Sequence, residues 1–158
     1  MENAVNIEPT MSSTYACEVA FVNKQRFNEA VARGDYPCAP RVDGRARVFA
    51  ARDVFGLWLY GHLTDEGIPP ARAGELACEL VEVMRHYPDL QEVLLVRDAF
   101  RRRHVCAPSD LQSLIEFRLG NTKPIGIETL DLRQMHSNIA HQFQKLTATF
   151  VHPDDAED

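Results

Sequence analysis

The sequence predicts a mixed α+β protein built from two parts, and three observations lead to that prediction. Apolar residues recur at helical spacing through much of the first half of the chain. An Asp43-Gly44 dipeptide separates two short β-prone runs, which is a strong signal for a hairpin. After Pro88, strand-like runs alternate with helical stretches. We therefore expect a helical head that carries a hairpin, followed by a small α/β segment with a C-terminal helix.

The composition, with 45% hydrophobic and 25% charged residues, is that of an ordinary soluble globular protein. The longest apolar runs, such as residues 93–96, are far shorter than the ~20 residues of a membrane span. No secretion signal opens the sequence, so we expect a cytoplasmic protein with no membrane partner. The cysteines are spaced singly, without a zinc or disulfide pattern, and we expect all of them to be reduced: Cys17, Cys38, Cys78 and Cys106.

The net charge of −6 is distributed unevenly along the chain. Residues 14–52 carry a net charge of +3, whereas residues 53–158 carry −7 and residues 1–13 carry −2. Electrostatic attraction to phosphate acts over a Debye length of about 8 to 10 Å, so the local charge decides binding rather than the total. A basic head on an acidic body is compatible with binding to nucleic acid.

The head is predicted to span residues 14–87, after a disordered tail over residues 1–13. Ser13 or Thr14 can cap its first helix. Residues 15–33 contain two short apolar stripes at helical spacing, and Asn23 between them is a good N-cap for the second helix. Gly34 is a suitable terminator. Two short helices joined by a tight turn are the helix-turn-helix arrangement.

The next segment, residues 41–49, predicts a two-stranded hairpin, or wing, with Asp43-Gly44 as its turn. Three arginines lie on it: Arg41, Arg45 and Arg47. We expect three apolar side chains to face the core: Val42, Val48 and Phe49. A helix should follow from Ala51 to Gly67, and another from near Pro69 to about Tyr87.

The second part, residues 88–151, is predicted to be an α/β domain that mediates dimerisation or binds a partner. Strands are expected at residues 92–97, 102–107 and 124–130. A capping box of Ser109 and Gln112 should start a helix that ends at Gly120. Asp131 should cap a last helix, before an acidic tail at residues 152–158. Its apolar stripe can pack on the sheet or on a second copy of the chain: Leu132, Met135, Ile139, Phe143 and Leu146.

The order of elements over residues 15–85 resembles the DNA-binding head of the MerR family. The motifs that carry this resemblance are Arg47-Val48-Phe49 at the end of the hairpin, Asp53-Val54 in the next helix, and Leu63 followed by Gly67-Ile68. The resemblance implies a winged helix-turn-helix, with the helix over residues 23–33 in the major groove of double-stranded DNA and the wing on the adjacent phosphates. It therefore implies a sequence-specific transcriptional regulator.

The residues expected to contact DNA divide into two groups. Four form the exposed face of the second helix: Lys24, Gln25, Arg26 and Asn28. Gln and Asn can pair bidentately with adenine and Arg with guanine. The other group would contact phosphates: Arg41, Arg45 and Arg47, with Tyr36 beside them. A homodimer would present two such helices to two half-sites.

Residue patterns that would indicate catalysis or metal binding are weak. His104 and Cys106 share a strand face but have no further ligands in sequence, and we find neither a phosphate-binding loop nor a nucleophile motif. We therefore expect no enzyme activity, cofactor or metal. Two alternatives stay open. One is a protein-interaction adaptor or phage-type accessory protein on a winged-helix scaffold, and the other is a small-molecule sensor with its ligand in the C-terminal segment.

Overall fold

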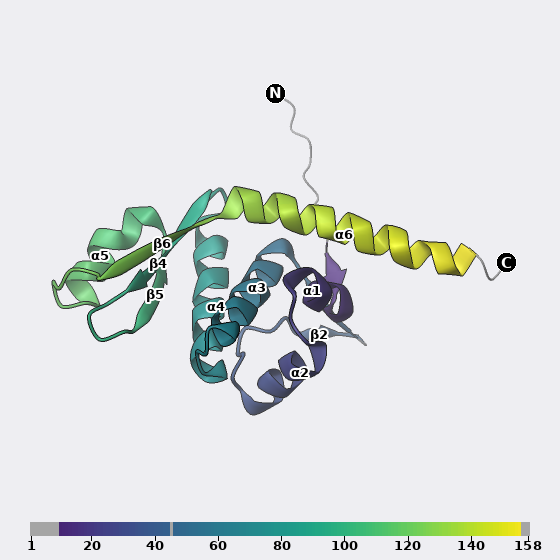
Figure 1. Ribbon diagram of the computed structural model, residues 1–158, viewed down its shortest axis with the longest axis horizontal. Coiled ribbons are helices and arrows are strands. Elements are labelled where there is room, and N and C mark those ends of the chain that lie inside the picture. The colour runs from purple at the N-terminus through teal and green to yellow at the C-terminus, as the bar shows by residue number, and fades with distance from the viewer. Residues whose placement is uncertain (1–9, 45, 156–158) are drawn as a thin grey trace, which may run out of the picture.

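The computed structural model describes residues 10–44 and 46–155 and is a mixed α+β structure with two small antiparallel sheets (Figure 1). The elements, in chain order, are β1 (Met11–Ser12), α1 (Ser13–Ala20), α2 (Lys24–Arg33), β2 (Val42–Asp43), β3 (Ala46–Phe49), α3 (Ala51–Asp65), α4 (Pro70–His86), β4 (Glu92–Arg97), β5 (Arg103–Cys106), the 3-10 helix η1 (Pro108–Asp110), α5 (Leu111–Phe117), β6 (Gly126–Asp131) and α6 (Leu132–Asp155). In the described part of the chain, no helix combines the length and apolar character that membrane crossing requires.

The end of the predicted disordered tail is ordered, which corrects that expectation for residues 11–13. Met11 is buried, and its strand pairs with β3 in the register Met11↔Phe49. Ser12, rather than Ser13 or Thr14, caps α1, because its hydroxyl accepts a hydrogen bond from the Tyr15 N–H (3.4 Å). The first strand is therefore held by the hairpin and leads directly into α1. Residues 1–9 lie outside the described part.

The predicted boundaries of the second helix in the head are confirmed. Asn23 caps α2, with its side-chain oxygen 3.0 Å from the Arg26 nitrogen, and Gly34 ends the helix in the left-handed region (φ 81°). Phe21 ends α1 in the same region (φ 59°). The connection between α1 and α2 is therefore limited to residues 21–23.

The hairpin is present, but its turn begins one residue later than predicted. The register pairs Asp43 with Ala46, so Asp43 belongs to β2 rather than to the turn, and Gly44 follows it at φ 68°. Arg45 lies outside the described residues. The expected core contacts are only partly right. Phe49 is fully buried, whereas the side chains of Val42 and Val48 are about half exposed. One face of this narrow sheet covers the core, and the alternating residues of the other face remain in solvent.

Helices α3 and α4 form the centre of the molecule and begin close to the predicted positions. Four leucines on their facing sides have no exposed surface: Leu59, Leu63, Leu76 and Leu80. At Gly74 the backbone of the segment after α2 comes so close that a Cβ would lie 1.7 Å from the Asp35 carbonyl oxygen. Glycine is therefore required at this contact on α4.

The second sheet has the strand order β5-β4-β6, with both pairs antiparallel. β4 coincides with the predicted run EVLLVR, and its apolar residues are buried on both faces. Val93 and Leu95 join the core of the head, whereas Leu94 and Val96 pack with α5 residues such as Leu114. The larger of the two apolar clusters therefore crosses residue 87, where we placed a domain boundary. The predicted capping box is wrong, because a 3-10 helix precedes α5 and no side chain caps it.

The last helix returns across the head and covers its first helix (Figure 1). Asp131 caps it as predicted, with Oδ1 3.0 Å from the Gln134 nitrogen. The Tyr15 and Phe143 rings meet edge to face at 5.8 Å, and Phe55 contacts His136 at 6.0 Å in the same way. Helix α6 is thus an integral part of the head rather than an appendage to the sheet.

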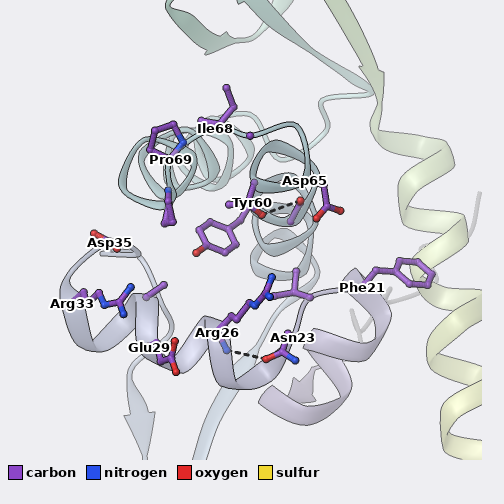
Figure 2. Close-up of a pocket in the computed structure, with 16 residues that line it drawn as sticks. Phe21, Asn23, Arg26, Glu29, Arg33, Asp35, Tyr60, Asp65, Ile68 and Pro69 are labelled. Atoms are coloured by element: carbon purple, nitrogen blue, oxygen red, sulfur yellow. Dashed lines mark hydrogen bonds between the residues drawn. The ribbon is translucent and has the colours of Figure 1, made fainter.

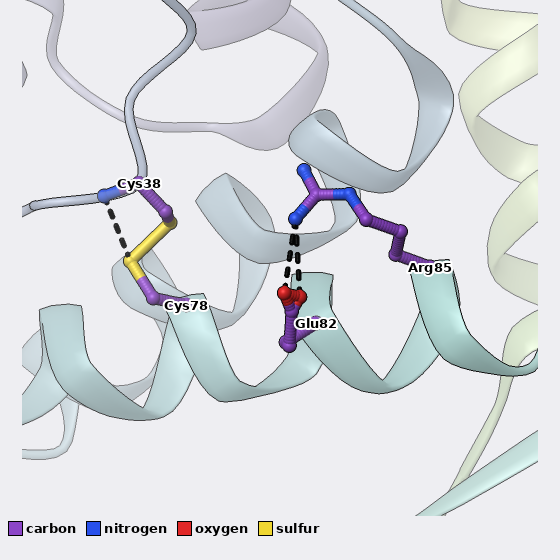
Figure 3. Close-up of a disulfide and its surroundings, with 4 residues drawn as sticks. All are labelled: Cys38, Cys78, Glu82 and Arg85. Carbon is purple, nitrogen blue, oxygen red and sulfur yellow. Dashed lines mark hydrogen bonds and ion pairs between the residues drawn. A yellow bond between two sulfur atoms is a disulfide. The ribbon is translucent and has the colours of Figure 1, made fainter.

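Two of the cysteines form a disulfide, which corrects the expectation that all are reduced. Cys38, in the segment between α2 and the hairpin, is bonded to Cys78 on α4, at a Cα–Cα distance of 5.5 Å (Figure 3). Cys17 and Cys106 are free and buried. Burial raises the pKa of the Cys17 thiol to about 11 and also raises that of Cys106, which disfavours the reactive thiolate form of both.

Candidate nucleic-acid interface

Helix α2 is attached to the body by one narrow face. Only Phe27 and Ala30 are buried, and the Phe27 ring contacts Phe49 (5.8 Å) and Tyr36 (5.3 Å) edge to face. The four side chains predicted to read bases are all exposed: Lys24, Gln25, Arg26 and Asn28. The amphipathic pattern of the helix thus leaves its polar side in solvent.

The exposed residues of α2 differ in what they contact. The Lys24 ammonium donates to the Thr14 hydroxyl (2.8 Å), and Gln25 lies 3.5 Å from the Glu29 carboxylate. These partners are themselves exposed, so both side chains can exchange them for a ligand at little cost. For the Asn28 side chain, the described residues provide no hydrogen bond. Both amide side chains of the helix, Gln25 and Asn28, are therefore accessible to a ligand.

Arg26 extends into a cavity rather than away from the body (Figure 2). The cavity, of about 600 Å³, lies between α2, the C-terminal end of α3 and the segment that leads into α4, and Arg33 and Tyr60 also line it. Burial raises the pKa of the Tyr60 hydroxyl; Asp35 adds to the rise, and Arg33 and Arg26 oppose it. The Arg26 side chain is therefore exposed, as a DNA contact requires, but it also faces other residues of its own chain.

The hairpin arginines are in three different situations. Arg41 is exposed just before β2. Arg47 is half-buried, and its guanidinium donates to the Pro40 carbonyl oxygen, which fixes the chain that enters the hairpin. Arg45 lies outside the described residues. Among the arginines predicted to contact phosphates, Arg41 is therefore accessible for such a contact, whereas Arg47 also has a structural role.

Tyr36 is not a surface residue, which corrects its assignment as a DNA contact. Only 3% of it is exposed, and its ring packs edge to face against Phe27 and Tyr60, each at 5.3 Å. Burial, followed by the nearby Asp53 carboxylate, raises the pKa of its hydroxyl far above the usual value. The segment that contains Tyr36 packs closely against α4 at Gly74.

The stripe predicted for dimerisation lies against the same chain. Leu132 and Ile139 are buried, and the other three, Met135, Phe143 and Leu146, are partly buried against the head core. An apolar helical stripe predicts burial but not the identity of the surface that covers it. The surface that we assigned to a second copy is therefore occupied by α1 and α3.

A basic region that the sequence analysis missed surrounds the turn between β4 and β5. The run Arg101-Arg102-Arg103 lies here, and Arg72 and Arg118 come close to it from α4 and from the end of α5. The triple arginine was visible in the sequence, but we interpreted it only as the beginning of a strand. The other two arginines are distant in sequence, so only the fold brings the five together.

Asp98 organises this turn. Its Oδ1 accepts hydrogen bonds from the N–H groups of Phe100 (2.8 Å) and Arg102 (3.0 Å), and its Oδ2 lies 3.0 Å from His104 Nε2. Asp98 and His104 are both buried. The hydrogen bond with His104 holds the pKa of the Asp98 carboxyl below its usual value; the two backbone donors add to this effect, and desolvation opposes it.

We expect Asp98→Asn to destabilise the fold at neutral pH and to do so less as the solution is acidified. A carboxyl with a lowered pKa stabilises the folded state above its unfolded pKa of about 3.9, and that contribution is lost as the pH falls through the lower folded value. Urea unfolding of both proteins between pH 7 and pH 3 measures the difference. A difference that does not change with pH would contradict the assignment.

Comparisons with known proteins add no family. The sequence matches no protein-family model, and it matches no curated protein. Among the described residues, no group of three or more His, Cys, Asp or Glu side chains is arranged to hold a metal ion.

Proposed function

We propose that this chain is a sequence-specific double-stranded DNA-binding regulator of transcription, of winged helix-turn-helix type, that acts in the cytoplasm without a catalytic role. In this proposal α2 enters the major groove and the β2–β3 hairpin lies on the neighbouring phosphates. The observation that supports it best is the exposure of one polar helix face, including Gln25 and Asn28, on a helix held rigidly by Phe27. Such a face can pair with base edges without any rearrangement of the body.

The test is retention of fragmented genomic DNA by the purified protein at two salt concentrations, followed by sequencing of the retained DNA. A short repeated site that survives the higher salt concentration would support the proposal, because non-specific binding is lost steeply as salt rises. If no DNA is retained even at low salt, the proposal is wrong.

We expect Gln25→Ala and Arg41→Ala to weaken DNA binding in different ways. Gln25→Ala should cost about 1 to 3 kcal/mol at one position of the site and relax the base preference there, because its amide would read a base. Arg41→Ala should weaken binding to all sequences alike and reduce the salt dependence by about one phosphate contact. Titrations of the selected site and of scrambled duplexes at several salt concentrations measure both effects. Equal, sequence-independent losses from the two variants would contradict this division of roles.

The proposal includes a homodimer, because two copies of the chain would contact two half-sites of the DNA. Since the apolar stripe of α6 lies on its own head, such a dimer has to use another surface. Sedimentation with and without the selected duplex tests this point. A single copy on the duplex would exclude the dimer and leave DNA binding itself untouched.

The adaptor alternative has one observation in its favour. Phe21 is 76% exposed at the turn before α2, and Val42 and Val48 are about half exposed on the hairpin. Exposed apolar side chains suit a protein partner better than phosphates do. If the DNA retention experiment fails, this surface is where a protein partner should be sought.

A further inference from the structure

A second cavity, of about 570 Å³, lies between the N-terminal end of α4 and the β4–β5 turn. Its volume is within the range of about 300 to 1,000 Å³ that is usual for small-molecule sites. Three apolar side chains contribute to its lining: Ile68, Pro69 and Leu76. His104 and five arginines line the rest: Arg72, Arg101, Arg102, Arg103 and Arg118. A hollow with so many guanidinium groups is a candidate site for an anion.

Three of the five guanidinium groups are held in place by neighbouring groups. Arg72 donates to the Arg103 carbonyl oxygen and lies 3.1 Å from Glu75. Arg103 lies 3.5 Å from Glu66, and Arg118 lies 3.4 Å from Glu79. These carboxylates balance the charge of three arginines and fix where their remaining N–H groups point.

The other two arginines, Arg101 and Arg102, have no ion pair with any residue that the structure describes. They therefore supply the positive charge that the glutamates leave uncompensated. Arg101 also has a φ of 69°, a conformation that is unfavourable for any side chain with a Cβ and that the Asp98 hydrogen bonds maintain. Glycine would adopt this backbone conformation more easily, so the turn alone does not explain why position 101 is an arginine.

Two further features of the cavity indicate that it binds a ligand. The N-terminal end of α4 reaches it at Pro69 and Arg72, and no side chain caps that end, so the helix dipole adds to the positive potential. His104 lines the cavity and is 94% buried, given its exposed fraction of 6%. Its Nδ1 has no hydrogen-bond partner among the described residues. The ring therefore holds a polar atom that the fold itself does not use.

We propose that this cavity binds a small molecule that carries two or more phosphate groups. Arginine pairs bidentately with phosphate oxygens, and several guanidinium groups around one hollow match closely linked phosphates better than a single carboxylate. The arginines surround a concave site with an apolar part, whereas duplex phosphates require a contact that follows an extended backbone. The site is distinct from α2, so this proposal does not depend on the proposed function.

The experiment is calorimetric titration of the full chain with inorganic tripolyphosphate at constant ionic strength, with sulfate as the reference anion. We expect saturable binding of one tripolyphosphate, and much weaker binding of sulfate. Arg101→Gly should lower the tripolyphosphate affinity about tenfold, because a charged hydrogen-bonding partner is lost. This variant also relieves the unfavourable φ, so the loss cannot be attributed to unfolding.

Two control variants accompany it. Asn121→Gly also places glycine at a positive φ (65°), without a change of charge, and Arg85→Ala removes an exposed arginine at the other end of α4. Both should bind tripolyphosphate as the wild type does. Absence of saturable binding, equal affinity for sulfate, or wild-type affinity in Arg101→Gly would each overturn the proposal.

A mixed-sequence duplex is the last arm of the experiment. Its affinity should be much less sensitive to Arg101→Gly than that of tripolyphosphate. An equal loss for the two ligands would assign the arginines to a nucleic-acid backbone and overturn the small-molecule proposal. Conversely, failure of the chain to bind any duplex would remove the proposed function and leave tripolyphosphate binding as a separate result.

Discussion

Gly74→Ala should destabilise the protein by about 3 kcal/mol, because the new methyl group has no space in a backbone contact. Its Cβ would lie 1.7 Å from the Asp35 carbonyl oxygen and 3.5 Å from the Tyr36 Cα. Relief requires the segment after α2 to move away from α4, and that movement would pull Tyr36 out of its contacts with Phe27 and Tyr60. Urea unfolding at neutral pH measures the change.

The neighbouring position on α4 provides the control. Glu75→Ala removes an exposed ion pair with Arg72 and should change the free energy of unfolding by less than about 0.5 kcal/mol. If Gly74→Ala were as stable as Glu75→Ala, the close approach of the two backbones would be refuted. The proposed DNA binding should be weaker in Gly74→Ala as well, since the displaced segment follows directly from α2.

Loss of the Cys38–Cys78 disulfide should lower stability by roughly 2 to 4 kcal/mol. The bond joins residues 40 positions apart and restricts the conformations of the unfolded chain. Opening the bond raises the entropy of the unfolded state and so favours unfolding. The double variant Cys38→Ser/Cys78→Ser should therefore melt well below the oxidised wild type. Thermal melts followed by circular dichroism, with and without dithiothreitol, measure the difference.

Dithiothreitol supplies the internal control for this prediction. It should lower the melting temperature of the wild type toward that of the double variant and leave the variant itself unchanged. Thiol titration in denaturant should find two free cysteines in the oxidised wild type, Cys17 and Cys106. Four free thiols together with a melting temperature that reductant does not change would show that the bond is absent.

Local signals in the sequence predicted the elements well. Asn23 and Gly34 delimit α2 because a cap and a terminator act within one turn of the helix, and EVLLVR is β4 because both faces of that strand are covered. Asp43 was wrongly placed in the hairpin turn, because the sequence indicates the glycine of a turn but not the pairing register of Asp43 with Ala46.

Features that depend on distant contacts could not be predicted. Singly spaced cysteines contain no information about which helix will approach which loop, so the Cys38–Cys78 pair was missed. Tyr36 was predicted to be a surface residue. Its burial depends on contact with α4 at Gly74, far away in sequence, and local sequence contains no sign of that contact. The arginines around the β4–β5 turn come from three separate segments, and only the tertiary structure makes them one group.

The docking of α6 on α1 has a consequence for how the protein is made. Tyr15 and Phe143 are separated by nearly the whole chain, yet each covers part of the other in the finished fold. During synthesis one apolar side of the first helix therefore stays uncovered until the last helix has left the ribosome. Until the last helix docks, this uncovered apolar side is accessible to chaperones and proteases.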